Sequence, residues 1–431
     1  MADTGDRVKL ICKDEEYEGI LMPSNKDSYF IKLNNGYNIG IEKSEVREIK
    51  VIEKARSVKE AKVEAKKNPK LPTISILHTG GTIASKVDYR TGAVYTAFSP
   101  SDLLNMFPEL SEIANFESEL IANMWSDDFR FAHFSLIAKA VEKHIKKGVD
   151  GIIIGMGTDN LAVGAAALAF MLDNLPIPVV IVGAQRSSDR GSSDAGMNLI
   201  CAAHFIAKSD FSGVAICMHG KSSDEKCLIM PPCKTRKLHA SRRDAFKVVN
   251  DEPIASIDYK TKKIEFIKKD YTKKDKKRDV VIKPNMEDKV GLIKVHVNMF
   301  PEQFSFFKGY RGLVIEGTGF GHTPGHAQNP EAEINKKIFP AIKDVIGSGC
   351  IVVMTTQCIF GRVSLNVYDK GRDLQALGVV SGEDMLAETA LVKLAWLLGN
   401  YNDKEKVKEL MRKNLRGEIT ERTEYKEEFL E

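Results

Sequence analysis

The stretch "TISILHTGGTIAS" (73–85) sets an apolar run directly before the pair Gly80-Gly81 and a threonine, Thr82. An apolar run without alternation is typical of a parallel strand covered on both faces. Two glycines at its exit permit a positive φ and the close approach of a ligand. Taken alone, the stretch also fits a phosphate cradle or a plain tight turn.

Apolar runs that alternate with helical patterns continue along the chain. Further apolar runs lie at 151–159, 178–186 and 213–220, and helical patterns separate them at 134–147, 160–174 and 194–208. A second group follows, with strands expected at 289–296, 312–319 and 349–356 and a helix at 383–400. This alternation predicts an α/β fold in two lobes, with ligands at the carboxyl ends of parallel strands.

The remaining segments differ from the two lobes. Residues 1–52 form short alternating runs with turn residues such as Asn35-Gly36, which predicts a small antiparallel β-barrel or sandwich. Residues 259–285 are basic and weakly patterned, so we expect a solvated linker or a surface hairpin, with RNA contact as the alternative. The predicted organisation is a barrel domain (1–52), a charged linker (53–72), a large lobe (73–258), a basic linker (259–285), a small lobe (286–402) and a charged tail (403–431).

Composition narrows the class of protein. The chain has 431 residues, 43% of them hydrophobic, and a net charge of +4, which is too mild to indicate nucleic-acid binding by the whole chain. No apolar run approaches the ~20 residues of a membrane span, and the N-terminus has no signal-peptide pattern. The seven cysteines show no metal-site or disulfide spacing. We expect reduced core thiols in a cytoplasmic protein, without a bound metal.

A second motif repeats the first. The run "IIIGMGTDN" (152–160) ends in Thr158 and Asp159, although either Asp159 or Asn160 could instead cap the following helix. A threonine hydroxyl is a weak nucleophile that needs a base. The candidate bases are lysines of "CKTRKLHASRRDAF" (233–246), most of which we expect to be solvated. A lysine acts as a base only where burial or nearby positive charge lowers its pKa.

These motifs together resemble the bacterial-type L-asparaginase/glutaminase family. The resemblance spans about 73–400 and rests on motifs in the family's order: "TGGTIAS", "GTD", "GAQRSSDRGSSDAGMNL" (183–199), "RKLHASRRDAF", "VIEGTGFGH" and "ETALVKLAWLLG". It implies the asparaginase-like two-lobed parallel-sheet fold. It also implies hydrolysis of side-chain amides through a threonine acyl-enzyme.

The resemblance implies roles residue by residue. Thr82 would be the nucleophile, and Thr158, Asp159 and Lys237 would form the relay that activates first the hydroxyl and then water. We prefer Lys237 to Lys234 because its nine-residue step to Phe246 suits the family pattern.

Three further residues match substrate-binding positions of the family. Tyr95 matches the tyrosine of a mobile flap, and Ser126 and Asp127 match the pair that holds the substrate's α-carboxylate and α-amino groups. Here the sequence departs from the family, because "SDD" stands where "SQD" or "SEN" is usual.

The first seventy residues, "RSSDRGSSDAGMNL" and "HASRRDAF" are similar to the D-subunit family of archaeal glutamyl-tRNA(Gln) amidotransferases. That resemblance implies a glutaminase subunit that hydrolyses glutamine or asparagine and passes ammonia through a channel to a partner, the amidotransferase's E subunit. The partner would bind tRNA, ATP and Mg²⁺ and convert Glu-tRNA(Gln) to Gln-tRNA(Gln). No cofactor is implied for this chain, which would form a homodimer within a heterotetramer.

Other interpretations are a stand-alone L-asparaginase/glutaminase and a catalytically silent scaffold, which the filled catalytic positions disfavour. His322 and His326 could suggest a metal pair, but no carboxylate or cysteine stands at ligand spacing, so we expect a loop beside the active site or beside a neighbouring subunit. "GTGFGH" (317–322) is a broken dinucleotide fingerprint without a following helix.

Overall fold

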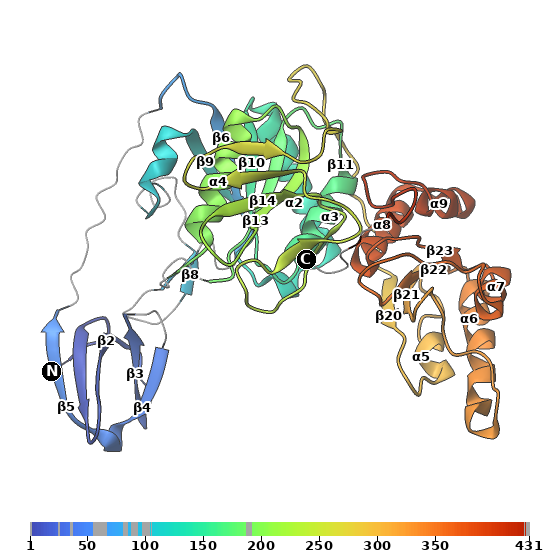
Figure 1. Cartoon of the computed structure of the whole chain (residues 1–431), viewed down its shortest axis with the longest axis horizontal. Coiled ribbons are helices and arrows are strands. Elements are labelled where there is room, and N and C mark those ends of the chain that lie inside the picture. The colour runs from blue at the N-terminus through green and yellow to red at the C-terminus, as the bar shows by residue number, and fades with distance from the viewer. Residues whose placement is uncertain are drawn as a thin grey trace.

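The computed structural model describes residues 2–24, 26–34, 38–54, 67–80, 85–87, 94–96, 104, 106–186, 192–425 and 427. Figure 1 shows three parts in chain order: a small N-terminal domain in blue, a large lobe in green and a small lobe in orange and red. The predicted α/β organisation in two lobes is confirmed.

The N-terminal domain is a five-stranded antiparallel sheet. Its strands are β1 (Arg7–Cys12), β2 (Glu16–Met22), β3 (Ser28–Leu33), β4 (Asn38–Glu42) and β5 (Val46–Glu53), in the order β4-β3-β2-β1-β5. Val8, Leu10 and Ile31 are fully buried in its core. No ladder joins the edge strands β4 and β5 among the described residues, so the predicted barrel is an open sheet, with register shifts in the β1–β5 pair that bend it.

The large lobe contains an eight-stranded sheet. Its strands are β6 (Thr73–His78), β9 (Asn115–Leu120), β10 (Gly151–Gly155), β12 (Pro178–Val182), β13 (Gly213–His219), β14 (Lys226–Met230), β17 (Ala255–Asp258) and β18 (Ile264–Phe266). Their order is β18-β17-β14-β13-β12-β10-β6-β9. The five strands from β13 to β9 are parallel, and the other three are antiparallel. The sheet therefore presents the carboxyl ends of β6 and β10 side by side.

Helices cover both faces of this sheet. The buried hydrophobic residues of α2 (Phe131–Lys146) and α3 (Leu161–Met171) belong to one core cluster. Those of α4 (Ala195–Lys208) belong to a second core cluster. Ile152 and Ile154 of β10 belong to the first cluster and Ile153 to the second. Both side-chain directions of the strand are thus buried, which explains its continuous apolar run.

The first part of the segment 259–285 forms a hairpin with β17, which is one of the two forms predicted for it, and the rest contacts the large lobe. Its residues 264–266 form β18 of the large sheet, and β19 (Val281–Ile282) pairs with β11 (Leu172–Asp173). Phe266 stacks on Tyr271 with ring centroids 4.3 Å apart. Several of its lysines form ion pairs with carboxylates of the lobe: Lys268–Asp251, Lys273–Asp210 and Lys276–Asp150. These contacts attach the segment to the lobe, and the carboxylates partly neutralise the positive charge of the segment.

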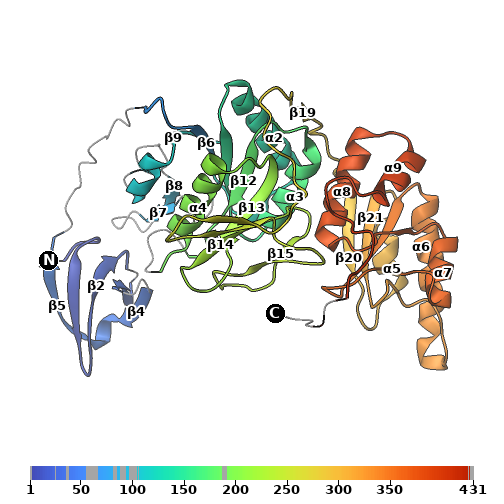
Figure 2. The ribbon, with the colours of Figure 1, turned by 45° about the horizontal axis from the view of Figure 1, so that its top comes forward.

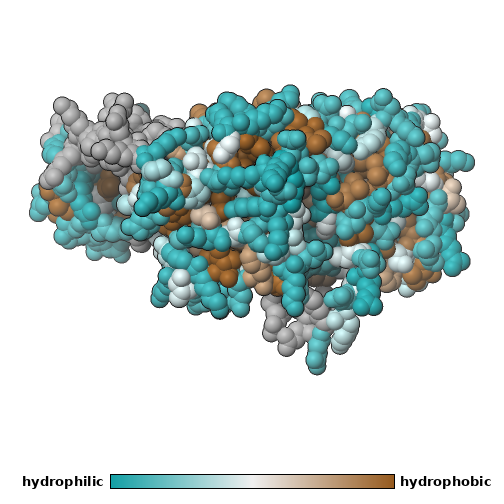
Figure 3. Space-filling view, turned by 90° about the horizontal axis from the view of Figure 1, so that it is seen from above, coloured by the Kyte–Doolittle hydropathy of each residue, from teal (hydrophilic) through white to brown (hydrophobic). Residues whose placement is uncertain are grey.

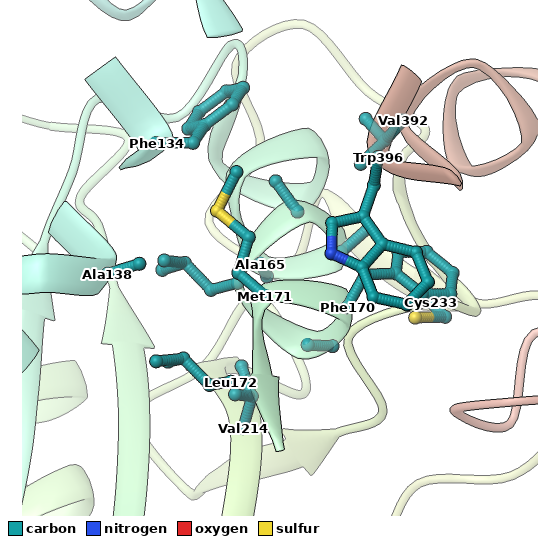
Figure 4. Packing of buried hydrophobic residues seen from close by; sticks show 14 of the residues in the cluster. Phe134, Ala138, Ala165, Phe170, Met171, Leu172, Val214, Cys233, Val392 and Trp396 are labelled. Carbon is teal, nitrogen blue, oxygen red and sulfur yellow. The ribbon is translucent and has the colours of Figure 1, made fainter. Parts of the chain in front are cut away.

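The small lobe has a four-stranded parallel sheet, β20-β21-β22-β23. Its strands are β20 (Val290–Lys294), β21 (Gly312–Gly317), β22 (Ile351–Thr356) and β23 (Val380–Ser381), and its helices are α5 (Pro301–Ser305), α6 (Ile338–Gly347), α7 (Asp369–Ala376), α8 (Ala387–Asn400) and α9 (Lys404–Met411). Helix α8 packs against α3 of the large lobe, and Trp396 stacks on Phe170 with centroids 5.6 Å apart (Figure 4). The two lobes therefore share one apolar core.

The cysteines and the surface agree with the composition. Cys201, Cys217, Cys227, Cys233 and Cys350 are buried free thiols, while Cys12 is half-buried and Cys358 is exposed. Hydrophilic residues cover most of the face in Figure 3, with separate hydrophobic patches between them. Among the helices of the described residues, none has the length and apolar character that a membrane crossing requires.

Candidate active site

The two glycine–threonine motifs follow neighbouring strands. In the β6–β10 ladder His78 pairs with Gly155, and the backbone N–H and the hydroxyl of Thr79 both donate to the Gly155 carbonyl at 3.0 Å. Gly80 has a φ of 96°, and a Cβ there would lie 2.6 Å from the Met124 carbonyl oxygen. Glycine is therefore required at this strand exit for both conformation and space.

Lys237 reaches this edge from a separate hairpin. It ends β15 (Thr235–Lys237), which pairs with β16 (Phe246–Val248), so that Lys237 stands opposite Phe246. Its Nζ lies 2.9 Å from Thr158 Oγ1 and 2.8 Å from Asp159 Oδ1. The Lys237 side chain is 15% exposed and that of Asp159 is 67% exposed. The structure thus brings together three of the four predicted relay and nucleophile residues.

Lys234 has a different environment from the solvated one expected of this segment. Its Nζ lies 2.7 Å from Asp384 Oδ2, and both side chains are fully buried. Burial lowers the pKa of Lys234, although the Asp384 carboxylate opposes that shift. The ammonium points into the contact between the lobes, away from Thr158, so Lys234 is not placed to activate a hydroxyl there.

Ser126 lies beside the Thr158-Asp159 turn. It begins the short 3₁₀ turn η4 (Ser126–Asp128) that follows β9, and a Cβ on Gly157 would lie 2.9 Å from Ser126 Oγ. The Asn160 backbone N–H donates to Ser126 Oγ at 3.3 Å, and its side-chain amide donates to the Ser126 carbonyl at 2.7 Å. Asp127 is exposed on the same turn.

The helix-cap alternative for this motif is not supported. Asn160 is the N-cap residue of α3, but no side-chain cap hydrogen bond is present there. Its side chain contacts Ser126, and that of Asp159 contacts Lys237. Sequence reasoning missed the role of Asn160 in holding Ser126, because the only available signal was its place at the end of the "GTDN" run.

Two predicted site residues fall outside what can be described. Thr82 lies outside the described residues. Tyr95 belongs to β8 (Val94–Thr96), which pairs with β7 (Ser85–Val87), but its side chain is likewise outside the described part of the structure. Their predicted roles as nucleophile and flap residue therefore stay predictions.

The histidines of the small lobe do not form a metal site. The ring of His322 lies edge-on to Tyr368, and His326 Nε2 lies 2.9 Å from Asp373 Oδ2. In the described parts of the chain, no group of three or more His, Cys, Asp or Glu side chains is arranged to hold a metal ion. Thr318 and His322 close a short turn after β21, so "GTGFGH" is a strand-end loop.

Comparison with known proteins agrees with this geometry. Three family models match the chain: "GatD N-terminal domain" at 2–52, "Asparaginase, N-terminal" at 73–271 and "Glutaminase/Asparaginase C-terminal domain" at 289–411. The L-asparaginase from Thermococcus kodakarensis matches with a TM-score of 0.70 at 30% identity, over 81% of this chain and 99% of its own. L-asparaginase I from Vibrio cholerae matches with a TM-score of 0.68 at 28% identity, over 81% of this chain and 99% of its own.

Relatives at higher identity span almost the whole chain. The D subunit of glutamyl-tRNA(Gln) amidotransferase from Pyrococcus furiosus is 48% identical, over 97% of this chain and 95% of its own length. The corresponding D subunit from Methanococcus maripaludis strain S2 is 45% identical, over 97% of this chain and 98% of its own. These relatives cover 97% of the chain, whereas the two L-asparaginases cover 81% of it. The chain therefore belongs to the D-subunit family of glutamyl-tRNA(Gln) amidotransferases.

Proposed function

We propose that the chain is the glutaminase subunit of a tRNA-dependent amidotransferase. It hydrolyses the side-chain amide of glutamine, or of asparagine, and supplies ammonia for the conversion of Glu-tRNA(Gln) to Gln-tRNA(Gln). The observation that carries the proposal is the placement of Lys237 Nζ within 2.9 Å of both Thr158 Oγ1 and Asp159 Oδ1 at the carboxyl end of β10.

The chemistry divides between two strand ends. Thr82, after β6, attacks the amide carbon; the tetrahedral intermediate then expels ammonia and leaves an acyl-enzyme. The hydroxyl of Thr158 and the amine of Lys237 lie in one hydrogen-bonded chain, which moves the proton from the nucleophile to the leaving nitrogen. Asp159 holds the Lys237 amine through its carboxylate, as the orienting member of the relay. Water then attacks the acyl-enzyme through the same relay.

Ser126 and Asp127 are the proposed amino-acid clamp. Ser126 is buried beside the Thr158-Asp159 turn, whereas Asp127 is exposed and able to reach a ligand. A carboxylate at position 127 suits the α-amino group of an amino-acid substrate. Tyr95 completes this part of the proposal as the flap residue.

Assembly is also part of the proposal. The partner is the amidotransferase's E subunit, which binds tRNA, ATP and Mg²⁺, and this chain pairs with a second copy of itself within a heterotetramer in the cytoplasm. Ammonia at neutral pH is mostly ammonium, which is not a nucleophile, so delivery through an internal channel preserves its reactivity. The support is the name of the relatives, which makes each of them one subunit of a larger enzyme, and the presence of the additional N-terminal domain.

The second candidate is a stand-alone L-asparaginase/glutaminase, which the likeness to the Thermococcus kodakarensis L-asparaginase favours. Ammonia release from glutamine and from asparagine is measured for the chain alone, with the partner, and with partner, Glu-tRNA(Gln) and ATP. We expect the rate to rise in the complete mixture and Thr82→Ala to be inactive throughout. Equal rates in all three mixtures would favour the stand-alone enzyme, and an active Thr82→Ala variant would remove the proposed nucleophile.

A further inference from the structure

The strand that carries Lys237 is held from the opposite lobe. Thr389 Oγ1 donates to the Cys233 carbonyl at 3.0 Å, Lys234 Nζ lies 2.7 Å from Asp384 Oδ2, and Arg236 lies 2.9 Å from Glu388. All three partner residues, Asp384, Glu388 and Thr389, lie at the start of α8 or in the turn before it. The approach of Lys237 to Thr158 therefore depends on the small lobe.

Asp384 is the centre of this attachment. Both members of the Lys234–Asp384 pair are fully buried, and Lys234 Nζ also donates to the Asp384 backbone carbonyl at 3.0 Å. The same carboxylate accepts the Thr420 backbone N–H at 3.0 Å and the Thr420 hydroxyl at 2.5 Å. A buried carboxylate with this many donors has one geometry, because any shift leaves a polar group unsatisfied.

Lys234 transmits that geometry along the extended chain. Its carbonyl accepts the Val249 N–H at 2.8 Å, which continues the β15–β16 hairpin, so Lys234 and Lys237 lie on one extended segment. Side chains three positions apart on such a segment point to opposite sides. Lys234 thus points into the contact between the lobes, and Lys237 points to Thr158.

We propose that Asp384, through Lys234 and with Thr420 as its second support, is a positioning residue for Lys237. The inference rests on the proposed function, because it concerns the geometry of the relay lysine. Thr420 lies in the C-terminal segment beyond residue 411, where the match to the asparaginase C-terminal domain ends. This segment passes between the two lobes (Figure 2). The segment thereby joins the tail of the chain to the strand of the catalytic lysine.

The test uses a buried hydrogen bond away from this attachment as its control. Ser212 is buried just before β13, at the amino end of the parallel strands, and its hydroxyl donates to the Leu175 carbonyl at 2.6 Å. We compare Asp384→Asn and Thr420→Val with Ser212→Ala, measuring kcat and KM for glutamine per folded molecule in the mixture that gives full activity. Displacement of a catalytic group by about 1 Å costs roughly 100-fold in rate. We therefore expect a kcat loss of tenfold or more for Asp384→Asn, a smaller one for Thr420→Val, and little change in KM.

A double variant covers the case in which Asp384→Asn does not fold. Lys234→Met with Asp384→Leu replaces the pair by apolar side chains of similar size, which restores burial without the directional hydrogen bonds. We expect it to fold and to keep a reduced kcat. Wild-type kcat in this variant, or an equal kcat loss in Ser212→Ala, would overturn the positioning role. A fully active Lys237→Ala variant would instead refute the proposed relay, which keeps the two failures distinguishable.

Discussion

Two lysines three residues apart should differ in how strongly the same substitution lowers the free energy of unfolding. We consider Lys237→Met and Lys234→Met, which remove an ammonium and keep most of the side-chain volume. Lys237 bonds to Asp159, whose side chain is 67% exposed, whereas the partner of Lys234, Asp384, is fully buried. The two substitutions therefore leave behind carboxylates with very different access to water.

The magnitudes follow from that difference. Water solvates Asp159 after Lys237→Met, and an ion pair with an exposed partner contributes about 0–1 kcal/mol to the free energy of unfolding. A lost general acid–base group costs about 10²–10⁴-fold in rate. In Lys234→Met, Asp384 keeps its bonds from Thr420 and the longer ion pair with Arg362 at 3.9 Å, but it loses the ammonium 2.7 Å away. Breaking a buried pair costs about 3–5 kcal/mol of unfolding free energy.

The assay pairs urea unfolding, followed by tryptophan fluorescence, with the initial rate of ammonia release from glutamine. Lys237→Met should unfold near the wild-type midpoint and lose at least 99% of the activity, a loss of about 100-fold at the lower limit for general acid–base catalysis. Lys234→Met should unfold at clearly lower urea. An active Lys237→Met variant, or a wild-type midpoint for Lys234→Met, would refute the assignment of these two lysines.

Three other outcomes are expected. Thr158→Val should lose most of the activity, and adding Lys237→Met should cost little more, because the effects of residues in one relay are not additive. Additive losses in the rate of ammonia release would show that Thr158 and Lys237 do not belong to one relay. Gly80→Ala should lower both activity and the unfolding midpoint, because its Cβ would lie 2.6 Å from Met124 O at a φ of 96°; wild-type values in both measurements would contradict the strain. Burial lowers the pKa of His78 from 6.5 to about 4. Between those pH values the unfolded chain binds more protons than the folded chain, so the free energy of unfolding falls as the pH falls, by about 1.4 kcal/mol per pH unit at most. His78→Gln should flatten that dependence in urea unfolding measured from pH 7 to 4, and an unchanged slope would rule out His78 as its source.

The sequence predicted the parts of the fold that depend on continuous apolar runs. The runs at 73–78 and 151–155 form β6 and β10 because both of their faces are buried. The sequence left a linker or a hairpin open at 259–285, because the lysines there outnumber the few apolar residues that pack on the lobe, and their carboxylate partners lie outside the segment. Asp150, Asp210 and Asp251 neutralise lysines of this segment only in the folded chain.

The site could be predicted only as far as its local motifs. Thr158, Asp159 and Lys237 stand in recognisable runs, and their meeting in space agrees with the predicted relay. The contacts that fix Lys237 could not be inferred, because 150 positions separate Lys234 from Asp384. A fully buried ammonium and a partly buried one look alike in "CKTRK", since burial is set by the tertiary fold.

The C-terminal segment shows how such distant contacts build one structure from two lobes. The sequence predicts a charged tail from residue 403, and within it Glu418 is fully buried against Lys393 of α8. Arg416 donates to the Ala169 carbonyl at 2.9 Å, at the end of α3 in the large lobe. A buried lysine without its carboxylate would be strongly unfavourable, so the small-lobe helix requires the tail for its own stability. The same segment continues to Thr420, whose backbone N–H donates to Asp384. The residues that close the core between the lobes therefore also support the strand of Lys237.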